Sequence, residues 1–302
     1  MTVLGFIGIG TMGAPMVHCL AMAGQRPLLQ DASIAAAQVA ADRDGLSAAT
    51  TAVEVGATCD LVILMLPDSA IVRDVCLGAG GLAAAMAPGG VIVDMSSSDP
   101  IETRKLGAEL AARGLILLDA PVSGGLRKAR DGSLAIMLGG DDAAAMDRAE
   151  PILTSMGKVF RAGPLAAGHA TKALNNYVSA AGLVAACEAV IVGRDFGLDP
   201  AVLTQIVNAS TGRNNSTENK IAQFVLSGAF RDAGFSLRLM TKDVGLAAGL
   251  GQHTGHDLPG LEALAKIWRD AADVLEPAAD HTEIFHFLES IDGANAPETS
   301  QG

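Results

Sequence analysis

The chain has 302 residues, of which 50% are hydrophobic and 18% are charged, so it can build two domains with buried cores. This composition excludes collagen, coiled-coil and disordered chains, and the 3% of aromatic residues predicts cores packed from small and aliphatic side chains. The formal charge of −12 repels phosphate backbones and anionic membranes, so we expect neither nucleic acid nor a membrane as a partner.

Short apolar segments in the first half alternate with stretches rich in alanine and charged residues, which is typical of β-α-β units. Because these segments are apolar throughout, they indicate strands buried on both faces, as in a parallel sheet covered by helices. Strands are predicted at Val3–Gly8, Pro27–Gln30, Leu61–Leu66, Gly90–Met95, Leu115–Ala120, Leu134–Leu138 and Val159–Arg161.

The strand-like segments stop after Gly163. From Ala166 to Phe196 the chain has no proline and carries apolar residues at helical spacing, which predicts one long helix. The rest, as far as Leu288, consists of helix-like segments. We therefore predict an α/β fold in which a doubly wound sheet domain is followed by an all-helical domain.

A glycine-rich turn follows the first predicted strand. Gly8, Gly10 and Gly13 have G-x-G-x-x-G spacing and lead into a predicted helix at Met12–Ala23. The first glycine permits a tight turn, the second lets the backbone approach a pyrophosphate, and the third lets helix and strand pack closely. A glycine-rich turn without a ligand remains the alternative. The residues expected to contact a dinucleotide here are Gly8, Ile9, Gly10, Thr11, Met12 and Gly13.

Asp31 ends the second predicted strand, eighteen residues after Gly13, where a carboxylate can accept hydrogen bonds from ribose hydroxyls. Ala32 and Ser33 follow it, so no Lys or Arg neutralises a 2′-phosphate, and the carboxylate repels one. We therefore expect NAD in preference to NADP. The alternative is that Asp31 caps the next helix.

Ser123, Gly124 and Gly125 follow the fifth predicted strand, at the edge where open α/β sheets bind ligands. Their backbone N–H groups and the Ser123 hydroxyl can form a nest for an anion such as a carboxylate. Taken in isolation, the segment favours an ordinary tight turn, and only the other motifs of the chain favour the anion nest.

Lys172 lies in the first turns of the long helix, and Asn175 and Asn176 follow on the same face. A lysine in a partly dehydrated cleft has a lowered pKa and can transfer a proton near neutrality; the alternative is a solvated surface lysine. Lys242 is a second lysine that either belongs to the site or lies on the surface. The polar residues 213–216 either line a substrate cleft or cap a helix. The six histidines show no catalytic or metal-binding spacing.

The four cysteines are far apart and form neither a C-x-x-C pair nor a cluster with histidine, so we expect no metal site and a reducing compartment. The segment from Val3 has no signal-peptide pattern, and the apolar runs at 61–67 and 115–118 are shorter than the ~20 residues of a membrane span. A cytoplasmic, soluble protein is expected.

Taken together, these segments resemble the β-hydroxyacid dehydrogenase family, which includes 3-hydroxyisobutyrate dehydrogenases and tartronate semialdehyde reductases. The likeness covers nearly the whole chain in four ordered blocks: GFIGIGTMGAPM, DAPVSGGLRKARDGSL, GHATKALNNYV and FSLRLMTKDVGLA. The stretches MLPDS and VDMSSSDP also look like family segments that border the cofactor. Several motifs at consistent separations are more specific than any one of them.

The resemblance implies a Rossmann-like domain that binds NAD(P), a long interdomain helix, and a helical domain for substrate binding and oligomerisation. The expected boundaries are 1–164 for the NAD-binding domain, 165–292 for the helical domain with the interdomain helix at 165–196, and 293–302 for a flexible tail. The resemblance also implies a small-molecule carboxylate substrate and a homodimer or homotetramer.

Residue roles follow from the resemblance by position. Lys172 would be the general acid and base, and Asn176, with Asn175 beside it, would orient the substrate. The substrate would be bound by Ser123, Gly124, Gly125, Phe235 and Asn215. Besides the glycine loop and Asp31, the cofactor would be contacted by Met65, Leu66, Pro67, Ser96 and Lys242.

The resulting hypothesis is reversible hydride transfer between NAD(H) and a small 3-hydroxy acid or its semialdehyde, of the 3-hydroxyisobutyrate or glycerate type. An imine or sulfonate-aldehyde reductase of the same superfamily is an alternative, and so is a scaffold that binds NAD without turnover. Lys172 is retained and the serine-glycine-glycine turn has no Arg, which favours the hydroxy acid.

Overall fold

The central strands each divide one apolar run between two hydrophobic cores. In β4 (Leu61–Leu64), Leu61 and Ile63 belong to the core on one face of the sheet, whereas Val62 and Leu64 belong to the core on the other. All four side chains are fully buried. Because successive side chains of a strand point to opposite faces, a strand covered on both faces must be apolar throughout.

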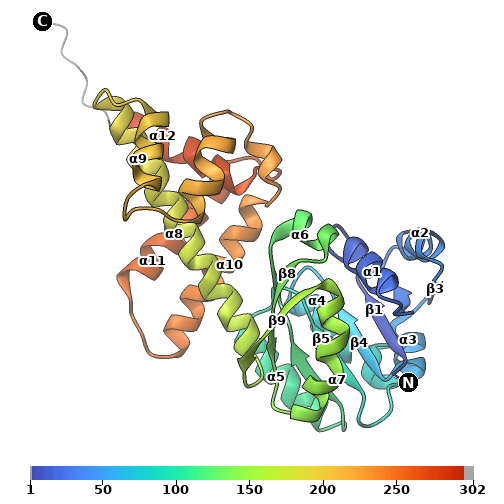
Figure 1. The fold of residues 1–302 in the computed structure, drawn as a ribbon. Helices are drawn as coiled ribbons and strands as arrows, with labels where there is room; N and C mark the ends of the chain where they lie inside the picture. The colour runs from blue at the N-terminus through green and yellow to red at the C-terminus, as the bar shows by residue number, and fades with distance from the viewer. Residues whose placement is uncertain (1, 296–302) are drawn as a thin grey trace, which may run out of the picture. The chain divides into compact units, whose positions relative to one another are not determined.

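The computed structural model describes residues 2–295, which divide into two units, one up to Lys172 and one from Ala173 (Figure 1). The first unit contains a nine-stranded sheet in the order β3-β2-β1-β4-β5-β6-β8-β7, with β9 beside β8. Its other strands are β1 (Leu4–Ile7), β2 (Leu28–Gln30), β3 (Ser47–Ala48), β5 (Val91–Asp94), β6 (Ile116–Asp119), β7 (Val122–Ser123), β8 (Leu134–Gly139) and β9 (Gly157–Gly163).

Helices cover both faces of this sheet. Helices α1, α2 and α7 contribute to the core on one face, and α3, α4 and α5 to the core on the other. The helices of the first unit are α1 (Gly13–Met22), α2 (Ile34–Asp44), α3 (Ala52–Thr58), α4 (Ser69–Leu77), η1 (Leu82–Ala84), α5 (Pro100–Ala111), α6 (Gly125–Asp131), α7 (Ala143–Leu153) and η2 (Thr154–Met156).

The predicted doubly wound α/β domain is confirmed, and its edge differs in detail from the prediction. Strands β1 to β6 are parallel, but β8 runs antiparallel to β6 and β7. The two-residue strands β3 and β7 were not predicted, because two residues are too few to show a periodic pattern. Strand order reverses at β1, which pairs with β2 on one side and β4 on the other. Ligands bind at the carboxyl ends of strands beside such a switch point.

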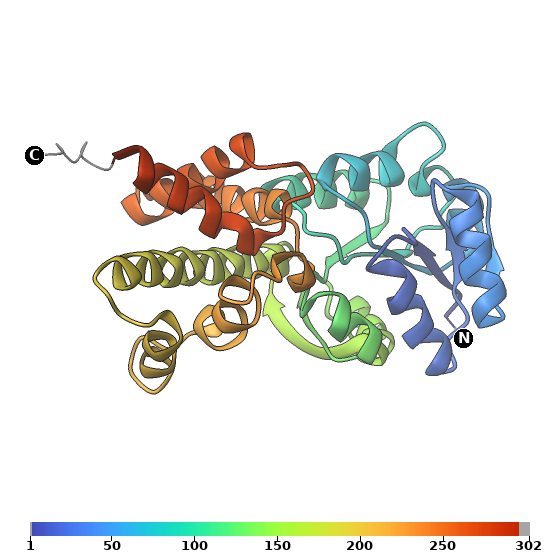
Figure 2. The ribbon, with the colours of Figure 1, turned by 90° about the horizontal axis from the view of Figure 1, so that it is seen from above.

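The second unit is helical, as predicted, and its core includes the fully buried Trp268. Helix α8 (Ala167–Asp195) begins in the first unit and continues into the second, and Figure 2 shows it as one unbroken yellow-green helix. The remaining elements are α9 (Pro200–Asn208), η3 (Thr217–Val225), η4 (Phe230–Ala233), α10 (Leu237–His253), α11 (Pro259–Val274), η5 (His281–Glu283) and α12 (Ile284–Asn295).

Two features bear on the expected tail and on membranes. Helix α12 includes the first three residues of the expected tail at 293–302, and residues 296–302 lie outside the described residues. Within residues 2–295, α8 alone is long and apolar enough to cross a bilayer, and half of its most apolar stretch is buried inside the structure. Core helices of soluble proteins have the same length and composition.

Candidate active site

The glycine-rich loop joins β1 to α1, and its three glycines have different surroundings. Gly8 has φ +102°, and a Cβ atom there would lie 2.2 Å from the carbonyl oxygen of Met65. A Cβ atom at Gly13 would lie 1.9 Å from the carbonyl oxygen of Gly8. In the described part of the chain, no atom beyond the two neighbouring residues lies within 4 Å of a Cβ placed at Gly10. Gly8 and Gly13 therefore close the turn, whereas Gly10 leaves open space beside the backbone.

The N-terminus of α1 follows this loop. Met12 occupies the N-cap position and, within the part of the chain described, no side chain caps this helix end. Thr11 is exposed and Ile9 is buried. An uncapped helix N-terminus carries N–H groups and a partial positive charge, which suit a phosphate.

Asp31 is half-buried directly after β2 and accepts two backbone hydrogen bonds. The N–H of Ile9 donates to its Oδ2 at 2.6 Å, and the N–H of Ser33 donates to its Oδ1 at 2.7 Å. The N-cap of α2 is Ser33, whose hydroxyl accepts from the N–H of Ala36. The capping alternative for Asp31 is therefore wrong. Each carboxylate oxygen has a second lone pair that remains available to a ribose hydroxyl.

The segments after β4 and β5 are joined by a buried serine. The N–H of Leu66 donates to Ser96 Oγ at 2.9 Å, and the N–H of Ser96 donates to Asp94 Oδ1 at 2.9 Å. Ser96 is fully buried, Met65 and Leu66 are half-buried, and Pro67 is exposed. Ser96 thus holds the Leu66 segment in place, and the more exposed residues of that segment are better placed to meet a ligand.

The serine-glycine-glycine segment runs from the end of β7 into the start of α6. Ser123 pairs with Ala135 of β8, and Gly124 and Gly125 both have positive φ, +135° and +66°. Both glycines are exposed, and no side chain in the described range caps α6. Two such residues in succession require glycine, and they leave backbone N–H groups at a helix start for an anion.

Helix α8 carries Lys172, Asn175 and Asn176. Lys172 is half-buried, Asn175 is exposed, and Asn176 is buried. Asn175 Nδ2 donates to Asn176 Oδ1 at 3.0 Å, and Asn176 Nδ2 donates to Oδ2 of the buried Asp243 at 2.6 Å. The amide of Asn176 is therefore oriented from both sides. Since Lys172 and Asn176 are four residues apart, they share one face of the helix.

Asp243, the partner of Asn176, was not among the residues singled out from the sequence, although it directly follows Lys242. It lies on α10 and is 2% exposed. A buried carboxylate that accepts a hydrogen bond from an amide fixes which way the amide points. The available signal was that Asp243 stands among the core-facing positions of an amphipathic helix, where a charged residue requires a partner.

The other predicted substrate residues lie elsewhere in the second unit. Phe235 is half-buried, and its ring meets the His281 ring edge-on at 5.6 Å between centroids. Asn215 is exposed ahead of the π-helix η3. Its neighbour Asn214 caps the helical turn that leads into η3, because Asn214 Oδ1 accepts the N–H groups of Ser216 and Thr217. The capping interpretation of this polar cluster thus applies to Asn214.

The predicted site residues fall into two sets along the chain. The first unit holds the glycine loop, Asp31, the segment 65–67, Ser96, the segment 123–125 and Lys172, and the second unit holds the remaining residues. In residues 2–295 no group of three or more His, Cys, Asp or Glu side chains is arranged to hold a metal ion. The first unit thus has a glycine loop and a serine-glycine-glycine turn that each lead into a helix start without a side-chain cap, and α8 carries an amine four residues before an oriented amide.

Comparison with known families covers almost the whole chain. Residues 3–168 match the NAD binding domain of 6-phosphogluconate dehydrogenase. Residues 166–288 match the NAD-binding domain of NADP-dependent 3-hydroxyisobutyrate dehydrogenase. These matches show a nicotinamide cofactor.

Individual relatives agree with the family matches. The chain is 36% identical to 2-(hydroxymethyl)glutarate dehydrogenase of Eubacterium barkeri, over 85% of this chain and 84% of the relative. It is 38% identical to NAD-dependent L-serine dehydrogenase of Pseudomonas aeruginosa, over 86% and 88% of the two chains. The solved structure of Mycobacterium tuberculosis 3-hydroxyisobutyrate dehydrogenase with L-serine is similar at a TM-score of 0.86 and 33% identity, covering 95% of this chain and 99% of the other. The chain therefore belongs to the 3-hydroxyisobutyrate dehydrogenase family and is a nicotinamide-dependent hydroxyacid dehydrogenase.

Proposed function

We propose that this protein oxidises the hydroxyl group of a small 3-hydroxy acid with NAD, and that Lys172 accepts the hydroxyl proton. The observation that carries this proposal is the hydrogen-bonded series Asn175–Asn176–Asp243, whose two asparagines follow Lys172 by three and four residues on α8. A buried carboxylate and an oriented amide next to an amine suit proton transfer, and they have no evident use in a protein that only binds a dinucleotide.

The glycine loop and Asp31 fit a dinucleotide. Gly10 leaves room for a pyrophosphate, and the uncapped start of α1 supplies N–H groups for it. Asp31 would accept hydrogen bonds from the adenosine ribose, and its charge favours NAD over NADP because it would repel a 2′-phosphate. Met65, Leu66, Pro67 and Lys242 would complete the site. When bound, the nicotinamide ring supplies the hydride acceptor.

The substrate carboxylate would bind at Ser123, Gly124 and Gly125. The positive φ angles at the two glycines and the uncapped start of α6 support this assignment, because they present backbone donors without a competing side chain. Phe235 and Asn215 would contact the rest of the substrate, so they would contribute to the choice of acid.

Lys172 would act as base in oxidation and as acid in reduction. Its Nζ must begin uncharged to take the proton of the substrate hydroxyl, and it becomes the ammonium as the C–H hydride leaves. In the reverse direction the ammonium returns that proton to the carbonyl oxygen. Asn176, held by Asp243, would donate a hydrogen bond to the reacting oxygen and so fix its distance from the amine.

The test is a cofactor-absorbance assay of the purified chain with NAD or NADP and a panel of acids: 3-hydroxyisobutyrate, L-serine, 2-(hydroxymethyl)glutarate and glycerate. We expect turnover of at least one acid, with NAD preferred. Lys172→Ala should lower kcat by about 10²–10⁴ and leave the Kd of NADH nearly unchanged. Lys266→Ala is the control, since this lysine is exposed on α11 and pairs with Asp270.

The outcomes separate the alternatives. A loss of less than tenfold in Lys172→Ala would remove Lys172 from proton transfer. Binding of NADH without turnover of any acid would indicate a scaffold or a different substrate class, and activity on imines or sulfonate aldehydes alone would indicate one of those reductases.

A further inference from the structure

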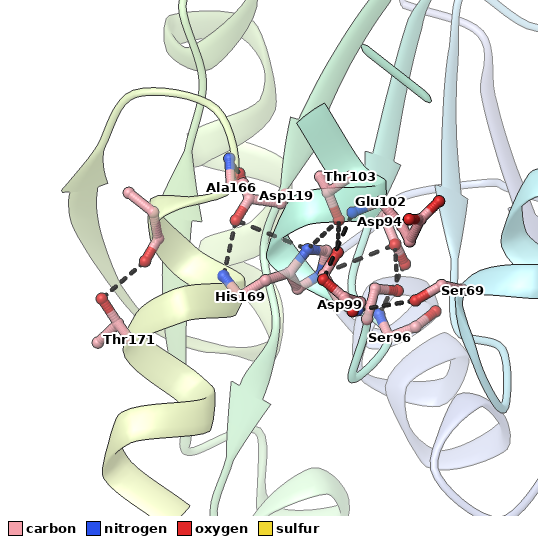
Figure 3. Close-up of polar contacts among 12 residues, drawn as sticks. Ser69, Asp94, Ser96, Asp99, Glu102, Thr103, Asp119, Ala166, His169 and Thr171 are labelled. Carbon is pink, nitrogen blue, oxygen red and sulfur yellow. Dashed lines mark hydrogen bonds and ion pairs between the residues drawn. The ribbon is translucent and has the colours of Figure 1, made fainter. Parts of the chain in front are cut away.

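Two buried carboxylates end neighbouring strands at the edge of the sheet where the proposed site lies. Asp94 is the last residue of β5 and Asp119 the last of β6, and the two are paired in the parallel register. Asp94 is 1% exposed and Asp119 is 0% exposed. Figure 3 shows the imidazole of His169, from the first turn of α8, beside both of them. Buried charges of this kind need partners, and the two carboxylates accept four hydrogen bonds from two segments, the loop after β5 and the start of α8.

Asp119 caps the start of α8 from a strand almost fifty residues earlier. Its Oδ1 accepts the N–H of Ala166 at 2.7 Å, and its Oδ2 accepts the N–H of His169 at 2.8 Å. A carboxylate at a helix N-terminus satisfies unpaired N–H groups and is favoured by the helix dipole. Burial is the main influence on this carboxyl and raises its pKa, while His169 and the two N–H groups favour its charged form. The first turn of α8 is thus tied to the strand that leads into Ser123.

Close packing leaves this turn little freedom to shift. A Cβ atom at Gly168 would lie 2.0 Å from the carbonyl oxygen of Met137, 2.8 Å from Asp119 Oδ2 and 3.0 Å from Pro121 Cδ. Ala166, which precedes the helix, has φ +75°, a conformation that costs a non-glycine residue energy unless the surroundings hold it. The backbone at the start of α8 is therefore fixed against β8 and the end of β6.

The side chain of His169 makes a second, independent connection. Its Nδ1 lies 2.8 Å from Thr103 Oγ1, and Thr103 Oγ1 donates to the carbonyl oxygen of Asp99 at 2.9 Å. The hydroxyl has one proton and the carbonyl can only accept, so both hydrogen bonds form only if His169 Nδ1 carries a proton. His169 is therefore the donor that joins α8 to the first turn of α5.

The other ring nitrogen points to the segment that leads into Ser96. His169 Nε2 lies 3.7 Å from Asp94 Oδ2 and has no hydrogen-bond partner among the residues described. Asp94 Oδ1 accepts the N–H of Ser96, and its Oδ2 accepts the hydroxyl of Ser98 at 2.7 Å. Ser96 in turn accepts the N–H of Leu66. Polar contacts therefore run from α8 to both segments proposed to border the cofactor.

We propose that His169 is a positioning residue of the active site, which fixes the rotation and depth of the first turn of α8 and thereby the location of Lys172 relative to the segments around Ser96 and Ser123. This inference rests on the proposed function of Lys172. His169 is three residues before Lys172, so both lie on neighbouring positions of one helix face and any rotation of the turn moves both.

The polarity of the cluster argues against a role in packing alone. A buried imidazole with one unpartnered nitrogen costs free energy that an apolar side chain of similar size would not. A helix start that needed only to be anchored is already held by Asp119 through backbone N–H groups. The additional side-chain hydrogen bond to Thr103 is directional, and proton transfer at Lys172 requires a fixed direction of the amine.

The experiment uses the full chain in four variants. His169→Leu removes both ring nitrogens, and His169→Asn keeps a donor near the place of Nδ1. Thr103→Val keeps the histidine and removes its acceptor. Thr171→Ala is the matched control, because Thr171 is exposed on the same turn and its hydroxyl donates only locally, to the carbonyl oxygen of Ala167. For each variant we would measure kcat and KM with NAD and the acid that the wild type turns over best, the Kd of NADH, and the thermal midpoint.

Two further measurements distinguish positioning from folding. The deuterium isotope effect on kcat, with deuterium on the carbon that carries the hydroxyl, reports whether hydride transfer limits turnover. Hydrogen exchange of the peptide that covers residues 166–173 reports how firmly the first turn of α8 is held, and it needs no substrate.

We expect His169→Leu and Thr103→Val to lower kcat by about 10–100-fold with a larger isotope effect, while the Kd of NADH changes less than threefold. Exchange in residues 166–173 should become at least tenfold faster. His169→Asn should recover most of kcat, and Thr171→Ala should resemble the wild type. A loss of folded protein alone would lower kcat without changing KM or the isotope effect.

The proposal is overturned if the folded His169→Leu and Thr103→Val variants keep kcat within threefold of the wild type, or if His169→Asn recovers no more than His169→Leu at equal stability. Should His169→Leu fail to fold, Thr103→Val decides on the same criteria. If the wild type turns over none of the acids, the proposed function fails, and the exchange of residues 166–173 still decides whether His169 holds the turn.

Discussion

Gly8, Gly10 and Gly13 differ in what surrounds the point where a side chain would begin. At Gly8 and Gly13 the nearest atoms of the chain itself leave no room for a Cβ atom, and at Gly10 no described atom beyond the two neighbouring residues is within 4 Å of one. The folded chain itself therefore requires glycine at positions 8 and 13. At position 10, glycine would be required only when a ligand approaches the backbone.

Alanine at the two positions should separate these requirements. Gly13→Ala places a methyl group 1.9 Å from the Gly8 carbonyl oxygen, so we expect a loss of about 1–3 kcal/mol in the free energy of unfolding without cofactor. Gly10→Ala should change that free energy by less than about 0.5 kcal/mol and still weaken NADH binding tenfold or more. Urea unfolding and a fluorescence titration with NADH measure the two quantities. Wild-type NADH affinity in Gly10→Ala would place the pyrophosphate elsewhere.

The sequence predicted positions that depend on local backbone geometry. It did not predict contacts between buried residues far apart in the chain. The position of Asp31 after a strand follows from a pattern in the chain, and the structure places it beside Ile9 of the glycine loop. Asp119 and His169 are fifty residues apart, and only the pairing of β5 with β6 and the docking of α8 show that they meet. In the sequence each of them is one polar residue beside apolar ones.

At the scale of an element, η3 is an unusual helix that contains the lysine Lys220. This segment is a π-helix of nine residues, a form that is rare and usually short. Lys220 lies within it, and its Nζ donates to Ser179 Oγ of α8 at 3.4 Å. Burial lowers the pKa of the Lys220 ammonium to about 8, although Asp280 favours the charged form. Helical periodicity predicted a helix here, but neither the π form nor the buried amine has a local sequence signal.

The lowered pKa makes the stability of this element depend on pH. Between about pH 8 and the ordinary lysine pKa near 10.5, the folded chain has lost the proton and the unfolded chain keeps it, so the free energy of unfolding rises with pH. Below pH 8 the cost of burying the ammonium is fully present. Lys220→Met should therefore stabilise the protein at pH 7, by roughly 3 kcal/mol at most, and should remove the rise between pH 8 and 10.

Urea unfolding at pH 7 and pH 9.5 measures both effects, with Lys266→Met as the control because Lys266 is exposed. If Lys220→Met were less stable than the wild type at pH 7, the amine would be contributing more through Ser179 and Asp280 than its burial costs.

At the scale of the whole molecule, the second unit exposes apolar side chains that its own core does not use. On α8, Val178 and Val192 are 67% and 68% exposed, and Phe196, directly after this helix, is 84% exposed. Val178, the exposed Ala185 and Val192 recur every seven residues, which is the spacing of helices that pack side by side. In the structure Ala180 and Ala186 are buried, whereas Ala185 is exposed. The sequence alone did not show which small residues of this helix face the core, because alanine occurs on both faces.

This stripe supports the expectation of a homodimer or homotetramer, and light scattering across a concentration series tests it. The wild type should have the mass of two or four chains. In a symmetric dimer each substitution counts twice, and a buried valine contributes about 1.5–3 kcal/mol, so Val192→Glu should weaken association by about 10²–10⁴. Val39→Glu is the matched control, since Val39 is 70% exposed on α2. A single-chain mass for the wild type at all concentrations, or equal dissociation by Val39→Glu, would mean that the stripe on α8 does not join two copies.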